Sequence, residues 1–269
     1  MSFDSITNRG EYFSNHYLDV VIGGDLGDLR KQWDNLDGRS EPTGGSRIRG
    51  LGARFFAARA DATEASANRR PDAIRHLNDL VLVALGFTPT RQTLTLARST
   101  VDELTVPLAA TVTTGTGLLL VALDAGLAGE VDDLFDTAGE ATDRPAAGLL
   151  LDPLMLTGEK KAVRAAVDAI GQLFSCDEPP RFVLVCGGRV ALLADRAKWA
   201  EGRFLAVDLD AALERNDTKK GGELETIAAL FTADVLVPGA LAGAGAGAEG
   251  DGGDEDEPSA GAGGGSILD

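Results

Sequence analysis

Two acidic residues near the ends of expected strands come closest, in this sequence, to a catalytic arrangement. Asp102 or Glu103 could supply a first carboxylate and Asp124 a second. Metal-dependent nucleases hold Mg²⁺ with carboxylates in such positions, and a lysine two residues after the second acid stabilises the attacking water. The corresponding residue here is Gly126. A nuclease that uses Glu103 and Asp124 therefore stays an alternative, and the simpler interpretation is that Asp124 ends a strand at a turn.

The remaining chemical motifs point to structure rather than to catalysis. Glu159 and Lys161 fit an acid-x-Lys pattern, but they open an expected helix, where they suit a solvated face. The chain has no convincing glycine loop of the Walker or methyltransferase type, no HExxH and no GxSxG. Cys176 and Cys186 lack neighbouring ligands, and we expect two buried thiols rather than a metal site or a disulfide. The sequence predicts no catalytic residue, no metal and no cofactor for this chain.

Arginine is concentrated between residues 47 and 75, where seven arginines accompany only three acids. The whole chain carries 42 acidic and 25 basic residues, a formal charge of −17, which argues against nucleic acid as a partner. Clustered arginines are nevertheless the usual ligands of phosphate, and a basic face can exist on an acidic protein. Our candidates for DNA contact are four of these arginines, with a solvated helix face as the alternative: Arg47, Arg49, Arg54 and Arg59.

Length and composition place these residues in a folded, soluble protein. A chain of 269 residues with 44% apolar residues can bury a substantial core. No apolar run approaches the roughly 20 residues of a membrane-spanning helix. The first residues, MSFDSITNRGEYFS, lack the basic and apolar regions of a signal peptide. We therefore expect a cytoplasmic protein without a membrane partner.

The elements that must position these side chains fall into three regions. Residues 1–86 are expected to form an all-helical arm, and residues 87–237 an α+β domain with one mixed sheet. Residues 238–269 are rich in Gly, Ala and acids. They cannot bury enough apolar surface to offset the entropy lost on ordering, and we expect a disordered linker.

Helical spacing of apolar residues predicts four helices in the arm, at residues 11–21, 26–36, 48–66 and 71–86. Gly23 and Gly24 predict a turn between the first two. Pro71 can start the fourth helix, because the first turn does not need its missing N–H, and Gly86 can end it. Such an arm is more typical of a docking or DNA-facing lobe than of a reaction centre.

In the second region, sequence patterns predict strands at residues 92–97, 104–112, 118–123, 181–186, 190–194 and 204–208, a helical turn at 131–135, and helices at 159–174 and 223–231. Gly187 and Gly188 predict a hairpin turn. Trp199 precedes the last strand, where an indole can cover the edge of a core. A helix, three strands, a helix and a further strand is the order of a restriction-endonuclease-like core, here in degenerate form.

Two stretches carry a resemblance to a known family. They are residues 8–18, NRGEYFSNHYL, and residues 178–213, EPPRFVLVCGGRVALLADRAKWAEGRFLAVDLDAAL. The Pro-Pro-Arg-aromatic entry, combined with the Lys-Trp-x-Glu-x-Arg connection, resembles the N-terminal region of large adenine-specific DNA methyltransferases. These enzymes belong to type IIG-like restriction-modification systems and to BREX-like and DISARM-like phage-defence systems. The resemblance extends over about residues 1–237.

The resemblance implies a noncatalytic N-terminal module of a DNA adenine methyltransferase, which contacts DNA or partner subunits. In the family this region precedes a methyltransferase domain and a target-recognition domain, and in some members it carries a nuclease. S-adenosylmethionine is implied only for the methyltransferase domain, and this chain is expected to stop in the linker before it. Besides an Mg²⁺-dependent restriction-type nuclease, a third hypothesis is an acidic protein-interaction scaffold, in which Asp132, Asp133 and Asp136 meet a basic partner.

Overall fold

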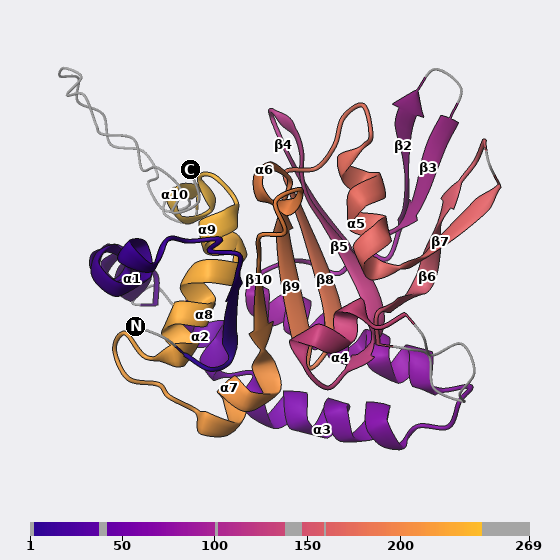
Figure 1. The fold of residues 1–269 in the computed structure, drawn as a ribbon. Helices are drawn as coiled ribbons and strands as arrows, with labels where there is room; N and C mark the ends of the chain where they lie inside the picture. Colours follow the sequence, from indigo (N-terminus) through magenta and orange to yellow (C-terminus); the bar gives the residue numbers. More distant parts are fainter. Residues whose placement is uncertain (1–2, 38–41, 100–101, 138–146, 159, 244–269) are drawn as a thin grey trace, which may run out of the picture.

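A mixed β-sheet of ten strands lies at the centre of the part of the chain that the structure describes (Figure 1). The structure is a computed structural model, and it describes residues 3–37, 42–99, 102–137, 147–158 and 160–243. Helices cover both faces of the sheet. The fold is therefore α+β, as the sequence predicted.

In chain order the strands are β1 (Ile6–Arg9), β2 (Thr93–Ser99), β3 (Asp102–Pro107), β4 (Ala110–Thr114), β5 (Gly117–Ala128), β6 (Leu149–Leu156), β7 (Lys161–Ala165), β8 (Phe182–Gly188), β9 (Val190–Asp195) and β10 (Phe204–Asp208). Their order in the sheet is β1-β10-β9-β8-β5-β6-β3-β2, with β4 also paired to β5 and β7 paired to β6. All neighbours are antiparallel except β5 and β8. That parallel pair needs a long crossover connection, which β6, β7 and a helix supply.

The helices are the π-helix η1 (Tyr17–Val21), α1 (Ile22–Asp37), α2 (Gly44–Arg49), α3 (Gly52–Glu64), α4 (Arg70–Leu85), the 3-10 helix η2 (Val131–Phe135), α5 (Ala166–Phe174), α6 (Arg196–Trp199), α7 (Leu209–Arg215), α8 (Glu223–Phe231), α9 (Ala233–Leu236) and α10 (Ala240–Gly243). The first four α-helices and α7 to α9 share one core with the sheet. Helix α5 and η2 pack on the opposite face. Figure 1 shows α4 and α5 on the two sides of the central strands.

Alternate residues of the central strands supply these two cores, because successive side chains of a strand point to opposite faces. In β8, Phe182 and Leu184 face the core with α1 to α4. Val183 and Val185 face the core with α5. Every residue of β8 is buried, as expected for a strand that is covered on both faces.

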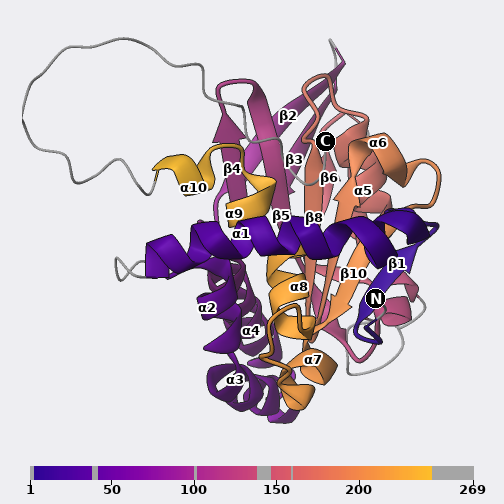
Figure 2. The ribbon, with the colours of Figure 1, turned by 90° about the vertical axis from the view of Figure 1, so that its left-hand side faces the viewer.

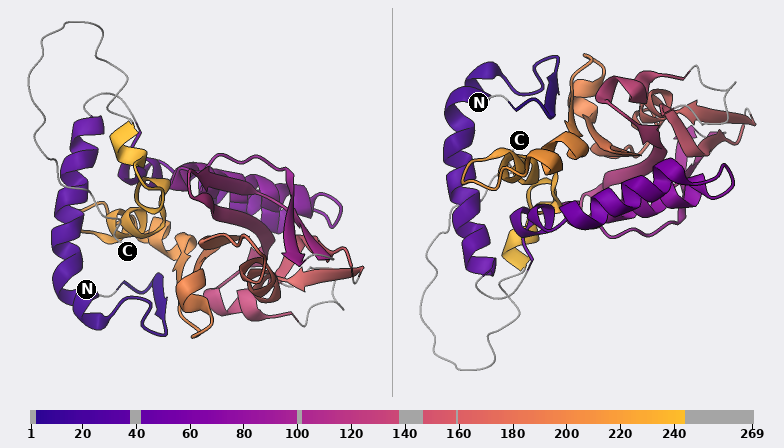
Figure 3. Two further views of the ribbon diagram at one scale, coloured as in Figure 1. Left: turned by 90° about the horizontal axis from the view of Figure 1, so that it is seen from above. Right: turned by 90° about the horizontal axis from the view of Figure 1, so that it is seen from below.

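The N-terminal region is not all-helical, which corrects the expectation for residues 1–86. Strand β1 pairs with β10, with Ile6 opposite Val207, and so forms one edge of the sheet. Four residues are too few for a periodic pattern to show in the sequence. The helix α1 then lies across α8 (Figure 2), at the opposite end of the molecule from β6 and β7 (Figure 3).

The expected helix boundaries in this region also change. No turn forms at Gly23 and Gly24, because both residues lie inside α1. Of the helix expected at residues 11–21, the part at Tyr17–Val21 is a π-helix. The single helix expected at residues 48–66 is two helices, α2 and α3, and Gly50 caps the first. Helix α4 ends as predicted, with Gly86 in the left-handed conformation at φ +86°.

Two expectations in the second region are wrong, and one strand was not predicted. Residues 104–112 form two strands, β3 and β4, rather than one. Residues 149–156 form β6, which no pattern predicted. The helix expected from residue 159 begins only at Ala166, because Lys161–Ala165 pairs with β6 as β7. Long-range pairing outweighed the helical spacing of the apolar residues there.

Other expectations are confirmed. Strands β8 and β9 form the predicted antiparallel hairpin, and β10, η2 and α8 have the predicted bounds. The disordered linker expected at residues 238–269 falls mostly on residues 244–269, outside the described residues, and Ala240–Gly243 is helix α10. Within the described ranges, no helix has the length and apolar character to cross a membrane.

Candidate functional site

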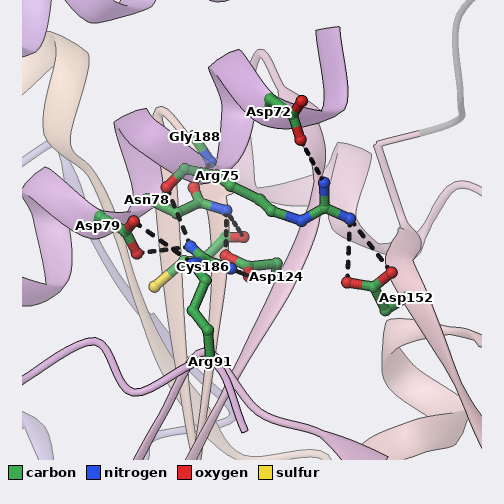
Figure 4. A network of polar contacts seen from close by, with 9 residues as sticks. All are labelled: Asp72, Arg75, Asn78, Asp79, Arg91, Asp124, Asp152, Cys186 and Gly188. Atoms are coloured by element: carbon green, nitrogen blue, oxygen red, sulfur yellow. Dashed lines mark hydrogen bonds and ion pairs between the residues drawn. The ribbon is translucent and has the colours of Figure 1, made fainter. Parts of the chain in front are cut away.

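A cavity of about 370 Å³ opens between α4, the start of β2 and the strands β5 and β6. Its apolar lining consists of Pro107, Leu108, Leu123 and Leu150, and its polar lining of Arg75, Arg91, Gln92, Thr93, Asp124 and Asp152. Figure 4 shows that its charged residues belong to a larger set of polar contacts. We call this set the arginine–aspartate network, which comprises Asp72, Arg75, Asn78, Asp79, Arg91, Asp124 and Asp152.

Helix α4 carries four members of the network, namely Asp72, Arg75, Asn78 and Asp79. Residues three or four positions apart lie on one face of a helix, and these four follow that spacing. Pro71 near the first turn and Gly86 at the end hold the helix to its length. The sequence of α4 thus sets this polar row beside its buried apolar face.

Asn78 joins α4 to the centre of the sheet. Its side chain is fully buried and donates hydrogen bonds to Asp124 Oδ1 (2.8 Å) and to the carbonyl of Cys186 (3.1 Å). Its Oδ1 accepts a hydrogen bond from the N–H of Gly188 (2.8 Å). Since an unpaired buried polar group costs roughly 1–3 kcal/mol, Asn78 satisfies groups that would otherwise destabilise the fold.

Arg91 lies between two carboxylates. Its guanidinium pairs with Asp124 on β5 and donates to Asp79 Oδ1 at 2.5 Å. A third contact runs from Nη2 to the carbonyl of Arg75 (3.1 Å). The backbone of Arg91 has φ +45°, a left-handed conformation that non-glycine residues rarely adopt. The chain therefore turns sharply after α4, which brings this guanidinium back to the helix.

Arg75 forms the second centre of the network and extends it to β6. Its Nη1 donates to Asp72 (2.9 Å) on the same helix, and its Nη2 contacts both oxygens of Asp152, the nearer at 3.0 Å. Asp72 is exposed and Asp152 is half exposed. The two arginines thus face four carboxylates, and the network carries a formal charge of −2 when all are ionised.

Burial is the largest influence on the pKa values of Asp124 and Cys186, the innermost ionisable groups near the cavity. Burial raises the pKa of Asp124, while the hydrogen bonds and charge of Arg91 and the hydrogen bond of Asn78 act in the opposite direction. Burial likewise raises the pKa of the Cys186 thiol, and the nearby Asp124 charge adds to this. A neutral thiol is a poor nucleophile. Cys176 and Cys186 are both free and buried, which confirms the expectation of two buried thiols.

The two carboxylates of the nuclease alternative are placed very differently. Asp124 is buried in the cavity, and both of its oxygens accept hydrogen bonds, one from Asn78 and one from Arg91. Glu103 is exposed on β3 and does not line the cavity. The neighbouring acid in the cavity is Asp152, which sequence reasoning missed because β6 was not predicted. No cluster of three or more His, Cys, Asp or Glu residues suited to a metal ion occurs in the described ranges.

Arg47, a candidate for DNA contact, is bound to neighbouring elements. Its guanidinium donates to Asp234 Oδ1 (2.6 Å) on α9 and to the carbonyls of Pro42 (2.6 Å) and Ala84 (3.3 Å). Its side chain is 18% exposed. The contacts therefore tie α2 to α9 and to the end of α4.

The other three candidate arginines differ in exposure. Arg59 pairs with the buried Asp210 of α7 and lies over the ring of Phe56, 5.2 Å from its centroid. Arg49 at the end of α2 and Arg54 on α3 are exposed. The structure does not bring the four guanidiniums together on one open face, since Arg47 and Arg59 bind acids from the C-terminal helices.

Comparisons with protein-family models, with curated proteins and with solved structures find no match to this chain. The resemblance to methyltransferases and the likeness to a restriction-endonuclease-like core therefore stay predictions from the sequence.

Proposed function

We propose that this chain is a noncatalytic N-terminal module of a DNA adenine methyltransferase of a restriction-modification or phage-defence system, which contacts DNA or partner subunits. The observation that carries the proposal is the engagement of Asp124. Its two oxygens accept hydrogen bonds from Arg91 and Asn78, which also hold α4, β5 and β8 together. A carboxylate used in this way supports a structural role rather than metal binding.

The stretches that carry the family resemblance support the same interpretation, because they form one structural unit. Strand β1 pairs with β10, and the hydroxyl of Tyr12 donates to Asp195 Oδ2 (3.3 Å) at the end of β9. Lys198 donates to the carbonyl of Tyr12 (3.0 Å) and lies over its ring. Burial lowers the pKa of Lys198 and raises that of the Tyr12 hydroxyl. These contacts support a role of the motif residues in holding this sheet edge together.

In this proposal the chemistry belongs to another part of the system. S-adenosylmethionine would bind to the methyltransferase domain or subunit, and this chain would position DNA or that subunit in the cytoplasm. For DNA contact, Arg49 and Arg54 are better placed than Arg47 and Arg59, because their side chains are more exposed. Phosphate contacts release counterions, so each one lost should reduce the salt dependence of binding by about one unit of slope.

The test is a titration of labelled duplex DNA over a series of salt concentrations with the parent chain and the Arg49→Ala/Arg54→Ala variant. We expect weaker binding and a flatter salt dependence for the variant. A charge-matched control is Lys219→Ala/Lys220→Ala, on the exposed loop after α7. Equal binding by parent and variant at every salt concentration, together with no co-purification of a tagged chain with a methyltransferase subunit, would contradict the proposal.

The restriction-type nuclease remains the second candidate because Asp124 and Asp152 line one cavity. Supercoiled plasmid incubated with the chain and Mg²⁺ or Mn²⁺ tests it, with Asp152→Asn as the variant. The side chain of Asp152 is half exposed, and within the arginine–aspartate network it contacts only Arg75. Cleavage by the parent that is lost in the variant would favour the nuclease over the noncatalytic module.

A further inference from the structure

A second groove, of about 440 Å³, lies between strand β7 and helix α5. Its strand side consists of Leu156 of β6 and residues 161–164 of β7, and its helix side of Val167, Asp168, Gly171 and Gln172. Strand β7 pairs with β6 on one side, and in the described part of the chain no strand pairs with its other side. The groove thus follows an open sheet edge that a helix flanks.

The charge of this groove is opposite to that of the whole chain. Lys161 and Arg164 are exposed, and neither has an ion-pair or hydrogen-bond partner through its side chain among the described residues. Asp168 is the one acid among the residues that line the groove. Two cations against one acid therefore line a groove of a protein with a formal charge of −17.

The groove also has open space on its helix side. A side chain added at Gly171 would meet no atom within 4 Å, so the centre of the helix wall is open. Val167 supplies apolar surface on the helix wall, whereas the side chain of Val163 is buried in the second core.

We propose that this groove binds an extended acidic segment of a partner polypeptide, which adds as a strand to β7. Strand addition supplies main-chain hydrogen bonds at an open edge, and pockets beside it select alternate side chains. One acidic side chain of the segment would pair with Lys161 and another with Arg164. Because these two cations are three residues apart on β7 and point to opposite faces, the two acids would also lie three positions apart in the segment. An apolar side chain of the segment would contact Val167. The proposal rests on the proposed function, because it assigns contact with a partner subunit to one surface and names the chemistry of the partner.

Charged residues on an edge strand also prevent unwanted pairing between sheets. The test must therefore separate binding from protection. The probe is a dye-labelled, N-acetylated peptide of about seven residues, with two Glu three positions apart and Val at the other positions, which is long enough to span a strand of ordinary length. We expect the full chain to bind this peptide in fluorescence anisotropy. A peptide with Lys in place of Glu should not bind, and N-methylation of alternate amides should abolish binding, because it removes the main-chain donors.

Two variants block the groove in different ways. Lys161→Glu/Arg164→Glu reverses its charge, and Gly171→Leu fills it. Leucine at residue 171 has room and favours the helix, so the fold should be retained. Each variant should weaken peptide binding by at least about tenfold. The matched controls are Lys219→Glu/Lys220→Glu, with the same change of charge, and Gly24→Leu, at another helical glycine with open space around it. Both controls should bind like the parent.

The outcomes separate this proposal from the function on which it rests. Absence of peptide binding, or equal binding by the blocked variants and the parent, overturns the groove proposal. Loss of duplex DNA binding in Lys161→Glu/Arg164→Glu without any peptide binding also overturns it, and assigns the basic edge to nucleic acid. Since the peptide assay needs only this chain, a failure of methyltransferase co-purification would contradict the proposed function and leave the groove result unaffected.

Discussion

Asp124 shows how neighbouring side chains can hold an acid that lines a cavity. Its side chain is 6% exposed, and its charge is balanced by Arg91, whose side chain is 30% exposed. Removing one partner of a buried pair leaves an uncompensated charge, which is costly. The stability of this chain should therefore depend on Arg91 in a manner that varies with pH.

Replacing Arg91 with Gln should destabilise the chain most at neutral pH. The pKa of Asp124 is already raised by burial, and Arg91 opposes that rise, so the variant raises the pKa further. A raised carboxyl pKa favours the folded state below the pKa of the unfolded chain, and this contribution is lost as the pH rises through the folded pKa. We expect a loss of roughly 2–3 kcal/mol at neutral pH, less than for a fully buried pair, because Arg91 is partly exposed.

Urea unfolding of parent and variant at about pH 7.5 and about pH 5 measures the difference, which should shrink at the lower pH. Combining Arg91→Gln with Asp124→Asn is the control, because it removes the more deeply buried of the two carboxylates that Arg91 binds and should reduce the pH dependence of the difference. A loss of the same size at both pH values in the single variant would contradict this assignment of the charge.

At the scale of elements, Asp234 connects helices that are far apart in the sequence. Its Oδ2 accepts hydrogen bonds from the indole of Trp33 (2.9 Å) on α1 and the N–H of Gly44 (2.6 Å) at the start of α2. Its Oδ1 accepts one from Arg47 (2.6 Å). The carboxylate of α9 thus receives three donors, and Arg47 contributes to the packing of these helices.

Asp234→Asn should lower the free energy of unfolding by roughly 2–4 kcal/mol. The amide keeps the shape of the side chain, but its N–H₂ group faces donors that the carboxylate accepted from, and the negative charge opposite Arg47 is lost. Arg47→Ala should cost a similar amount. Asp72→Asn is the matched control, since Asp72 is 84% exposed in its pair with Arg75 and an exposed pair contributes about 0–1 kcal/mol. Urea midpoints report all three. An unchanged urea midpoint in Arg47→Ala would show that the fold does not need this arginine, and Arg47 would again be a candidate for DNA contact.

At the scale of the whole molecule, the helices of the N-terminal region and the sheet bury their apolar side chains in one core. That core includes Leu26 of α1, Phe55 of α3, Leu184 of β8 and Phe231 of α8. The second core, on the other face, shares β5, β8, β9 and β10 with the first. Since the two cores meet at the same strands, we expect the chain to unfold in one cooperative transition.

The two tryptophans test this expectation, because they report on different cores. Trp33 is buried with α1 and α8, and Trp199 packs against the other core, 6.0 Å from the ring of Phe204. Variants with one tryptophan each, Trp199→Phe and Trp33→Phe, should show urea midpoints by fluorescence that coincide with the midpoint of the same variant by circular dichroism. A separate, earlier transition seen only through Trp33 would indicate that the N-terminal region unfolds independently.

The sequence by itself determined the elements whose signals are local. Pro71 and Gly86 bound α4, and the glycine turn between the apolar runs of β8 and β9 identified that hairpin, because turn geometry and helix ends depend on a few neighbouring residues. The same local reasoning identified Asp124 as a candidate acid and a cluster of arginines, since residue type and spacing are visible without a fold.

Only the tertiary structure decided what those residues do. Strand β7 and β6 exist because each supplies backbone partners to the other, and no local pattern records that pairing. The partners of Asp124 come from residues 46 and 33 positions away, and the partner of Arg47 from 187 positions away. A charge is available to a ligand or committed to the fold according to which distant side chain lies within hydrogen-bonding distance, and that distance is a property of the packed chain alone.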